Sequence, residues 1–423
     1  MKIYKTDNNL ATLFFNSFFN HKDTSFKRYI FGHNQYSKNI IKVLLDNKIE
    51  CDGIIDDFTT NQYYEVKDYK IPIIKVNDLV PHSLSNKSID KSPLCIKVVV
   101  VVTSQTKSAI AKIQSISNDS TLIDLEYIDY FALQRASRES ANLKLLELEF
   151  FDAFKCNHLH KNVSTWEDFR LDYLNHKNKY QEIFDRLQDE ESKSQFEKII
   201  NFRLNSDYSF MKDFDFIPQE QYFEDFYDID NVRYFFDIGA YRGETSLEFV
   251  KRNNLYQYIY YFEPDRQNFI IAKQNIESKL KNTKGFNVGL ANTDDLTFFC
   301  SDSTSGHIIS DINKMNNLNN HFEIQLCKLD TLLQEGKIEI LDSVLDGGGL
   351  MLIKVDIESV EIEALKGMQR FITKYRPMIA ICVYHSFDDF YKIPELVFSI
   401  RCDYKMYFRH YSSGLTESVM FFI

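Results

Sequence analysis

The segment 234–245 constrains the fold of this 423-residue chain more than any other stretch. An apolar run ends in Asp237, a turn follows through Gly239 and Gly243, and a helix is predicted after the turn. A strand, a glycine turn and a helix in this order open a nucleoside-binding α/β unit, because the glycine backbone can come close to a ligand.

A second apolar run, 258–262, ends in Glu263, whose carboxylate can accept both hydroxyls of a ribose. The turn before it has the spacing G-x-x-x-G with an acid in front, unlike the G-x-G-x-x-G that cradles a pyrophosphate. We therefore predict S-adenosylmethionine, a nucleoside without a pyrophosphate, in preference to NAD. Helix capping is the alternative for Asp237, and a solvated loop is the alternative for Glu263. The predicted cofactor-binding residues are Asp237, Gly239, Ala240, Tyr241, Gly243, Glu263, Pro264, Asp265 and Asp302.

The pattern of predicted elements gives an α/β fold in three parts. Residues 1–135 alternate strands and helices and predict a small Rossmann-like domain, with 97–102 as a buried parallel strand. Residues 136–230 show helical spacing of apolar side chains and predict a helical connector. Residues 231–423 predict a Rossmann-like domain whose parallel sheet ends in an antiparallel hairpin. Its expected strands are 234–236, 258–262, 286–290, 350–355 and 378–383, and its hairpin is 404–409 with 418–422.

The predicted catalytic residues lie at the carboxyl ends of two strands, where ligands of such sheets bind. Asp356 follows the strand 350–355, and His385 follows the last parallel strand. Methyl transfer from a sulfonium needs aligned reactants and a base for the acceptor hydroxyl, so we predict His385 as the general base and Asp356 and Glu358 as further catalytic residues. A carboxylate at Asp356 could contact the ammonium of the methionyl part or orient the acceptor. A histidine bonded to loop backbone and acids matching a helix dipole are the alternatives. No metal ligands are assigned, although a carboxylate at Asp356 could bind a metal.

Two further polar groups leave alternatives open. Arg409, His410 and Tyr411 in the hairpin could bind an anionic or polyhydroxylated acceptor or form a solvated turn. Near the N-terminus a turn with Gly32, Asn34 and Ser37 precedes a helix, and Asp56 and Asp57 follow the next strand. One glycine is weak support for NAD, so a nucleotide-sugar site and a packing domain both stay open. An NAD-linked oxidoreductase or epimerase and a nucleotide-sugar-binding scaffold are the rival functions.

Composition excludes several classes of protein. The formal net charge of −11 argues against sequence-independent binding to nucleic acid. Seven scattered cysteines without a C-x-x-C pair indicate reduced thiols in a cytoplasm. The sequence has no apolar run of the ~18 residues that span a bilayer and no signal peptide at its start. We expect a cytoplasmic protein and leave homo-oligomerisation open.

A set of motifs resembles the FkbM family of S-adenosylmethionine-dependent methyltransferases. The resemblance implies O-methylation, commonly of sugars in glycans, capsules or natural products, and hence a sugar, glycan or nucleotide-linked sugar precursor as substrate. Ser359 stands where that family usually has glycine. The N-terminal part is similar to the small Rossmann-like domain of some bacterial sugar-modifying enzymes, which implies a nucleotide-linked sugar there. The motifs of the first resemblance are 237–244, 262–265, 287–291, 353–358 with Glu361, 363–367, 380–385, 407–411 and 417–422, and those of the second are 29–32, 53–57 and 71–73.

Overall fold

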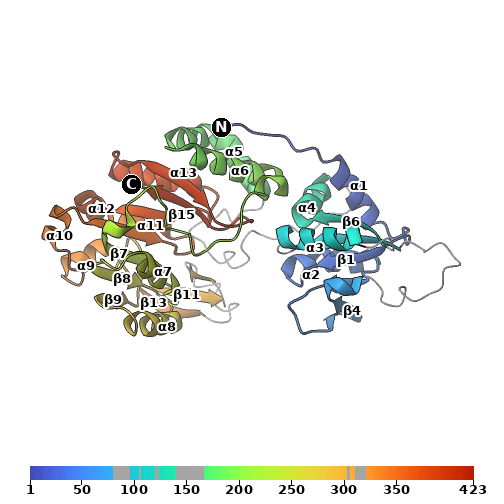
Figure 1. Cartoon of the computed structure of the whole chain (residues 1–423), viewed down its shortest axis with the longest axis horizontal. Coiled ribbons are helices and arrows are strands. Elements are labelled where there is room, and N and C mark those ends of the chain that lie inside the picture. The colour runs from blue at the N-terminus through green and yellow to red at the C-terminus, as the bar shows by residue number, and fades with distance from the viewer. Residues whose placement is uncertain (80–95, 104–105, 120–122, 140–165, 303–304, 310–320) are drawn as a thin grey trace. The chain divides into compact units, whose positions relative to one another are not determined.

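The computed structural model describes residues 1–79, 96–103, 106–119, 123–139, 166–302, 305–309 and 321–423. The described chain forms two compact units, which are drawn in Figure 1. The larger unit comprises 1–3, the described part of 149–200, and 214–423. The smaller unit comprises the described part of 4–148 together with 201–213.

The smaller unit is built around one six-stranded sheet. Its elements are α1 (Asn9–Phe18), β1 (Lys27–Phe31), α2 (Gln35–Asp46), β2 (Gly53–Ile55), β3 (Tyr63–Val66), β4 (Tyr69–Ile74), the 3-10 helix η1 (Val76–Leu79), β5 (Ile96–Val102), α3 (Thr106–Asp119), β6 (Ile123–Asp129), α4 (Tyr130–Glu139) and the 3-10 helix η4 (Tyr208–Met211). The strand order is β3-β4-β2-β1-β5-β6, and all pairs except β3 with β4 are parallel.

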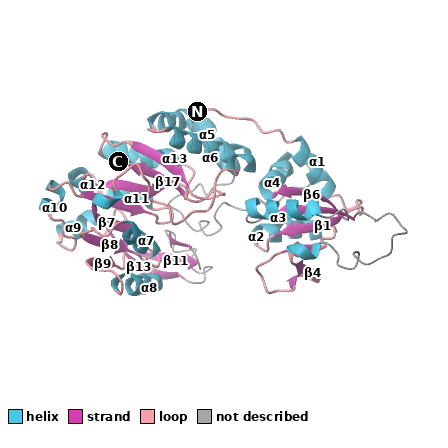
Figure 2. Ribbon diagram, in the orientation of Figure 1, coloured by secondary structure: helices cyan, strands magenta, loops and turns pink. Residues whose placement is uncertain are grey.

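Both faces of this sheet are covered, as a run such as 97–102 requires. Successive side chains of a strand point to opposite faces, so Val99 and Val101 join one core and Val98, Val100 and Val102 join the other. The first core packs against α1, α2 and α4, and the second packs against α3 and η1. Figure 2 shows these helices around the strands.

The larger unit has more elements and two sheets. Its elements are α5 (Trp166–Arg186), α6 (Glu190–Asn205, of which 201–205 belong to the smaller unit), the 3-10 helix η5 (Ile229–Asn231), β7 (Val232–Ile238), α7 (Glu244–Arg252), β8 (Tyr258–Phe262), α8 (Arg266–Glu277), β9 (Thr283–Phe286), β10 (Gly289–Leu290), β11 (Leu296–Asp302), β12 (Ser305–Ile309), β13 (His321–Cys327), α9 (Leu329–Gln334), α10 (Asp342–Asp346), β14 (Leu350–Val355), α11 (Glu361–Gly367), α12 (Gln369–Tyr375), β15 (Met378–Cys382), α13 (Asp389–Ile400), β16 (Met406–His410) and β17 (Ser418–Phe422).

Its main sheet has seven strands in the order β16-β17-β15-β14-β7-β8-β9. The strands from β15 to β9 are parallel, and β17 runs antiparallel to both β15 and β16. Successive side chains of β7 point to opposite faces of the sheet and pack against helices on each face. Phe235 stacks on Phe249 of α7, with ring centroids 4.5 Å apart, and Phe236 meets Phe371 of α12 at 5.1 Å. The α/β fold class with a terminal antiparallel hairpin is therefore confirmed.

The expected strand 286–290 is wrong as a single element. The chain leaves the main sheet after Phe286, and Gly289 pairs with Leu326 of β13 in a separate four-stranded sheet, β10-β13-β11-β12. The side chain of Asn287 holds the bend, because its amide donates to the backbone oxygens of Glu263 (2.8 Å) and Pro264 (3.0 Å). Apolar content alone does not reveal such a bend.

Candidate active site

The candidate site lies at the carboxyl ends of the central strands of the main sheet. In chain order β7 comes first, yet it lies in the middle, with β8 and β9 on one side and β14 and β15 on the other. Ligands of open α/β sheets bind where the strand order reverses in this way, here between β7 and β14. Asp237 and Gly239 lie at the end of β7, and Asp356 follows β14, where its backbone N–H donates to Ile238.

The turn after β7 is held by main-chain contacts. Gly239 has φ +80°, and its N–H and that of Ala240 donate to the carbonyl of Phe262. A Cβ on Gly239 would lie 1.8 Å from the carbonyl oxygen of Asp356. The glycine is therefore required by the neighbouring backbone itself, a reason that differs from the ligand approach expected from the sequence.

Glu263 lies beside this turn, as its position after β8 predicts. Its Oε2 accepts from the N–H of Tyr241 and its Oε1 from the N–H of Asp265, both at 2.9 Å. Each carboxylate oxygen can accept a second hydrogen bond, so ribose hydroxyls can still be bound. Burial raises the pKa of Glu263 to about 7, because desolvation of the carboxylate outweighs these hydrogen bonds.

Asp237 is fully buried beneath the turn. Its Oδ2 accepts from the hydroxyl of Ser246 at 2.7 Å, and its Oδ1 lies 3.2 Å from Nζ of the buried Lys354. Nζ of Lys354 also donates to the carbonyl of Gly239. Asp237 thus neutralises a buried lysine that supports the glycine turn, a partner that the sequence analysis missed although Lys354 stands two residues before Asp356.

The other predicted cofactor residues surround the same turn with distinct local roles. Asp265 caps α8, because its Oδ1 accepts from the N–H groups of Gln267 and Asn268. Tyr241 is partly exposed with φ +48°, and Gly243 has φ +90° and precedes α7 directly, as expected. Ala240 is buried in the turn, and Pro264 links Glu263 to the cap of α8. Asp302 ends β11 in the separate sheet, and its side chain lies outside the described part of the structure.

The three predicted catalytic residues come together. Nε2 of the buried His385 lies 3.5 Å from Oδ1 of Asp356 and 3.3 Å from Oε2 of Glu358. Nδ1 of the same ring lies 2.7 Å from Oε1 of Glu361, the first residue of α11. One imidazole after β15 therefore contacts three carboxylates of the segment that follows the neighbouring strand β14.

This arrangement favours the protonated imidazole. Burial alone would lower the pKa of His385, but the carboxylates of Glu361, Glu358 and Asp356 outweigh it and raise the pKa well above its usual value. Burial raises the pKa of Glu358 to about 8, and the carboxylates of Asp356 and Glu361 add to that rise. Burial also disfavours charge on Asp356, yet Lys354 and His385 hold its pKa below the usual range. A ring that keeps its proton at neutral pH is a poor general base, which weighs against the role expected for His385.

The spacing of Glu358 and Glu361, three residues apart, predicts a helix that begins at Glu358, but the helix after β14 begins at Glu361. Glu358 and Glu361 do not share one helical face, because α11 begins at Glu361 and Glu358 lies in the turn before it. Glu358 has φ +57° and Ser359 has φ +76°, a left-handed conformation that non-glycine residues rarely adopt. Two successive left-handed residues turn Glu358 back toward His385 instead of extending the helix.

Asp356 is oriented by residues that no sequence motif indicates. The hydroxyl of Tyr222, a residue with φ +74°, donates to Oδ2 of Asp356 at 2.9 Å. The amide of Gln221 donates to that hydroxyl and to Oε2 of Glu417, each at 2.9 Å. These residues come from segments far apart in the sequence, so no local motif could indicate their contact.

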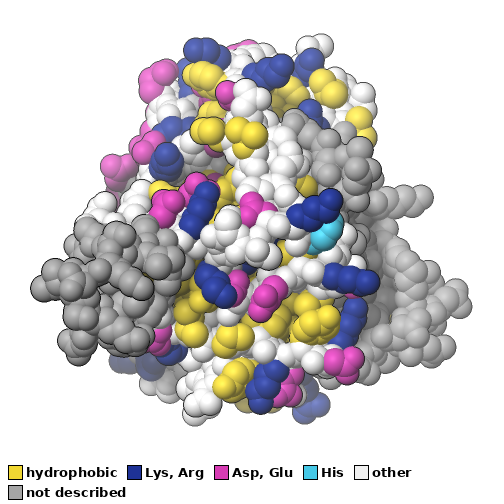
Figure 3. Space-filling view, turned by 90° about the vertical axis from the view of Figure 1, so that its right-hand side faces the viewer, with side chains coloured by type: hydrophobic (Ala, Val, Ile, Leu, Met, Phe, Trp, Pro, Cys, Tyr) yellow, Lys and Arg dark blue, Asp and Glu magenta, His cyan; other side chains and the backbone are white. Residues whose placement is uncertain are grey.

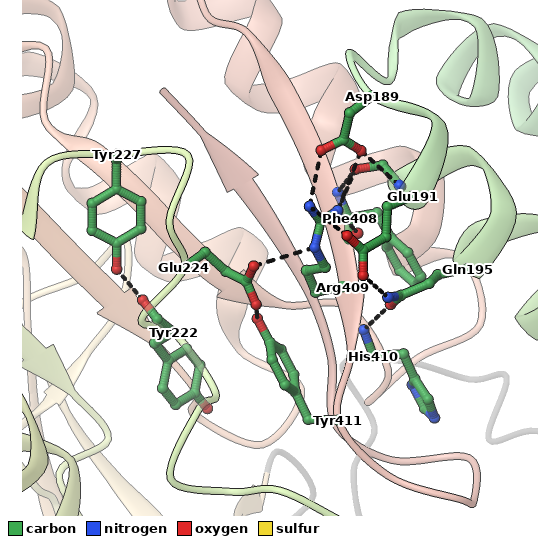
Figure 4. Close-up of polar contacts among 11 residues, drawn as sticks. Asp189, Glu191, Gln195, Tyr222, Glu224, Tyr227, Phe408, Arg409, His410 and Tyr411 are labelled. Atoms are coloured by element: carbon green, nitrogen blue, oxygen red, sulfur yellow. Dashed lines mark hydrogen bonds and ion pairs between the residues drawn. The ribbon is translucent and has the colours of Figure 1, made fainter. Parts of the chain in front are cut away.

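The solvated-turn alternative is wrong for Arg409, and a role in binding the acceptor stays a prediction. It is buried in β16, where Nη2 lies 2.9 Å from Oδ2 of Asp189 and Nη1 donates to Ser192 at 2.8 Å, as Figure 4 shows for the acidic partner. Nε donates to Glu224 at 3.3 Å, and the hydroxyl of Tyr411 donates to the same carboxylate at 2.7 Å. This network fastens the start of α6 to the hairpin.

His410 is buried in the same hairpin. Its N–H donates to Oε1 of Gln195 on α6 at 2.7 Å, and its Nδ1 lies 2.8 Å from the hydroxyl of Ser418 on β17.

In the smaller unit, the polar turn is closed by its own residues. Asn34 and Ser37 form a reciprocal capping box at the start of α2. The carboxylate of Asp56 accepts from the N–H groups of His33, Phe58 and Thr59. The carboxylate oxygens of Asp56 therefore already bind the backbone of the neighbouring loops. The nucleotide-sugar site stays a prediction.

Two observations bear on partners. On the face drawn in Figure 3, basic and acidic side chains lie interspersed with hydrophobic ones. Of the helices in the described part of the chain, none combines the length and apolar character needed to cross a membrane.

The fold and the site define a Rossmann-like α/β unit with a glycine turn, an acid on the next strand and a polar cluster beside both. Residues 237–406 match the model of the Methyltransferase FkbM domain family. The chain is also similar in fold to a solved structure described as "Methyltransferase FkbM from Methylobacillus flagellatus KT", with a TM-score of 0.64 and 17% sequence identity over 99% of this chain and 94% of that one. No curated protein matches. The matched residues all lie in the larger unit, which is thus similar to an FkbM methyltransferase domain.

Proposed function

We propose that this protein is an S-adenosylmethionine-dependent O-methyltransferase that acts on a hydroxyl of a sugar, glycan or nucleotide-linked sugar precursor. The observation that carries the proposal is the junction of β7 and β14, where the Gly239 turn, the Glu263 carboxylate and the Asp356 cluster meet at one edge of the sheet. The match of residues 237–406 to a methyltransferase family supports the same reaction class. The acceptor class rests on the resemblance to that family.

The cofactor would lie across the turn after β7. Glu263 would accept the ribose hydroxyls, and the backbone from Gly239 to Tyr241 would line the same side of the ligand. Asp237 would act indirectly, because its carboxylate is engaged by Ser246 and Lys354. When bound, S-adenosylmethionine supplies an electrophilic methyl group on a positively charged sulfur.

The reaction moves one methyl group and one proton. The acceptor oxygen forms a bond to the methyl carbon while the bond from carbon to sulfur breaks, and the products are a methyl ether, S-adenosylhomocysteine and a proton. Asp356 and His385 would hold the hydroxyl, and a carboxylate of this cluster would receive that proton. Within this cluster, Glu358 has the pKa best suited to a base near neutrality, since a base works best when its pKa is close to the working pH.

Calorimetry with S-adenosylhomocysteine, NAD and UDP-sugars on the full-length protein tests the cofactor. We expect S-adenosylhomocysteine to bind and Glu263→Gln to weaken it at least about tenfold, because charged hydrogen bonds contribute about 1.5–3 kcal/mol each. Glu335→Gln, which alters an exposed pair with Lys337, is the matched control and should bind normally. Binding of NAD without S-adenosylhomocysteine would refute the proposal. Methyl incorporation into a panel of sugars and nucleotide-linked sugars then tests the acceptor.

A further inference from the structure

The polar cluster at the ends of β14 and β15 has the spacing of a cation site. Nε2 of His385 lies 3.5 Å from Oδ1 of Asp356 and 3.3 Å from Oε2 of Glu358. Neighbouring ligand atoms around a divalent cation with bonds of ~2.1 Å are about 3 Å apart. Small side-chain movements would therefore bring these atoms to ligand distances.

The surrounding groups orient the atoms that would face the cation. Oε1 of Glu361 lies 2.7 Å from Nδ1 of His385, which places the proton of a neutral ring on Nδ1 and the lone pair on Nε2. A carboxylate behind a ligating histidine is the usual arrangement in metal sites. Oδ2 of Asp356 accepts from Tyr222 at 2.9 Å, so Oδ1 is the oxygen directed at His385.

A second observation points to a missing positive charge. Glu361 is 1% exposed, and its Oε2 has no hydrogen-bond partner among the described residues. One of its carboxylate oxygens lies within 4.8 Å of ligand atoms of both Asp356 and His385. Leaving a buried carboxylate oxygen without a partner is costly, and His385 engages only the other oxygen, Oε1. A bound cation would compensate this charge.

We propose that Asp356, Glu358 and His385 bind one divalent cation, with Glu361 positioning the histidine. A mixed set of imidazole and carboxylate ligands suits a first-row ion such as Mn²⁺ or Zn²⁺. The cation would lie beside the Gly239 turn, where it would lower the pKa of a bound acceptor hydroxyl and ease proton removal. That catalytic role rests on the proposed function, whereas the binding of the cation does not.

The test uses the full-length protein, freed of metal with EDTA and then of EDTA. Titration with Mn²⁺, followed by the paramagnetic resonance signal of the free ion, should show one Mn²⁺ per chain. Asp356→Asn and Glu358→Gln should weaken binding at least about tenfold, and Glu361→Gln by about 10–100-fold through loss of orientation of His385. Glu363→Gln is the matched control on α11, because its carboxylate pairs with Lys366 at 2.6 Å, and it should bind as the wild type does.

The inference is overturned if the wild type takes up neither Mn²⁺ nor Zn²⁺ in stoichiometric amount, or if Glu358→Gln and Glu363→Gln bind alike. The side chain of Glu358 is 28% exposed, so this variant decides the matter even if Asp356→Asn fails to fold. A parallel titration with S-adenosylhomocysteine separates the two proposals. If the protein binds S-adenosylhomocysteine but not Mn²⁺, the cation site alone is refuted. If it binds Mn²⁺ but not S-adenosylhomocysteine, the proposed function alone is refuted.

Discussion

Glu263 combines a place beside the Gly239 turn with a raised pKa. Burial raises the pKa of this carboxyl to about 7, the neighbouring Asp265 adds to the rise, and Lys354 opposes it. Ribose hydroxyls would donate to the ionised carboxylate, so cofactor binding should require deprotonated Glu263. The dissociation constant of S-adenosylhomocysteine should therefore rise about tenfold for each pH unit below about 7 and level off above it. Calorimetry from about pH 5.5 to about pH 8.5 measures this.

The matched variant for that prediction is Glu263→Gln, which should bind more weakly and with a flat pH dependence. A wild-type dissociation constant that stays constant across the same pH range would contradict the prediction. In that case the ribose would be held by groups that do not titrate near neutrality.

Ser359 has a backbone conformation that favours glycine. It is buried and has φ +76°, at the position where the resemblance to the FkbM family implies glycine. Ser359→Gly and Ser359→Ala both remove the hydroxyl, but only glycine relieves the left-handed strain. We expect the glycine variant to be more stable than the alanine variant by about 1 kcal/mol, measured by urea unfolding. Equal stabilities would show that the turn around Glu358 carries no strain at this position.

The polar residues at the strand ends were predictable from the sequence, because ligands of such sheets bind at the carboxyl ends of parallel strands. Asp237, Glu263, Asp356 and His385 each follow an apolar run, and parallel strands bring such ends to one edge. Their partners were not predictable, because Lys354 and Tyr222 reach the site through tertiary contacts. The protonated state favoured for His385 also depends on Glu361, Glu358 and Asp356 being near at the same time.

At the level of elements, the pairing of α6 with β16 depends on Arg409. Its guanidinium contacts Asp189 and Glu224, and all three side chains lose much of their water. We expect Arg409→Gln to lower the free energy of unfolding by about 2–3 kcal/mol. This is less than the cost of breaking a fully buried ion pair, because Asp189 is about one-third exposed. Lys179→Gln, which breaks the exposed pair with Glu395, should cost about 1 kcal/mol or less. Denaturant unfolding measures both.

The stabilisation from the ion pair between Arg409 and Asp189 should depend on pH. Burial raises the pKa of Asp189, but hydrogen bonds from Arg409 and Ser192 outweigh it and lower the pKa to about 2. Because the pKa of Asp189 is lower in the folded state, its carboxylate stabilises the folded state at pH values above the unfolded pKa of about 4. That stabilisation is lost as the pH falls toward about 2. The stability difference between the wild type and Arg409→Gln should shrink in this window. A stability difference that is the same at about pH 3 and about pH 6 would contradict the ion-pair account.

Most elements follow from hydrophobic periodicity, and the exceptions have physical causes. The β-branched run 97–102 and the apolar run 350–355 give β5 and β14, because strands buried on both faces need continuous apolar residues. The segment 286–290 breaks into β9 and β10 because Asn287 bonds back to the chain after β8. The late start of α11 reflects the left-handed pair at Glu358 and Ser359, which periodicity does not register.

At the level of the whole molecule, the segment 201–213 belongs to the smaller unit although α6 begins in the larger one. The aromatic rings of Phe202 and Phe131 lie 5.0 Å apart, and the guanidinium of Arg135 donates to the backbone of Ser206. A three-part division of the chain by composition stays a prediction, because helical periodicity cannot tell which neighbour a helix packs against.

A fragment of residues 136–423 tests whether the larger unit binds cofactor by itself. It retains every residue around the Gly239 turn but loses Phe131, so the buried Phe202 and Tyr208 would become exposed and promote aggregation. We expect the fragment with Phe202→Gln and Tyr208→Gln to be soluble and to bind S-adenosylhomocysteine within about threefold of the full-length dissociation constant, a difference of less than 1 kcal/mol. A folded, soluble fragment that fails to bind would show that the smaller unit contributes to the cofactor site, since the central sheet and its turn would be intact.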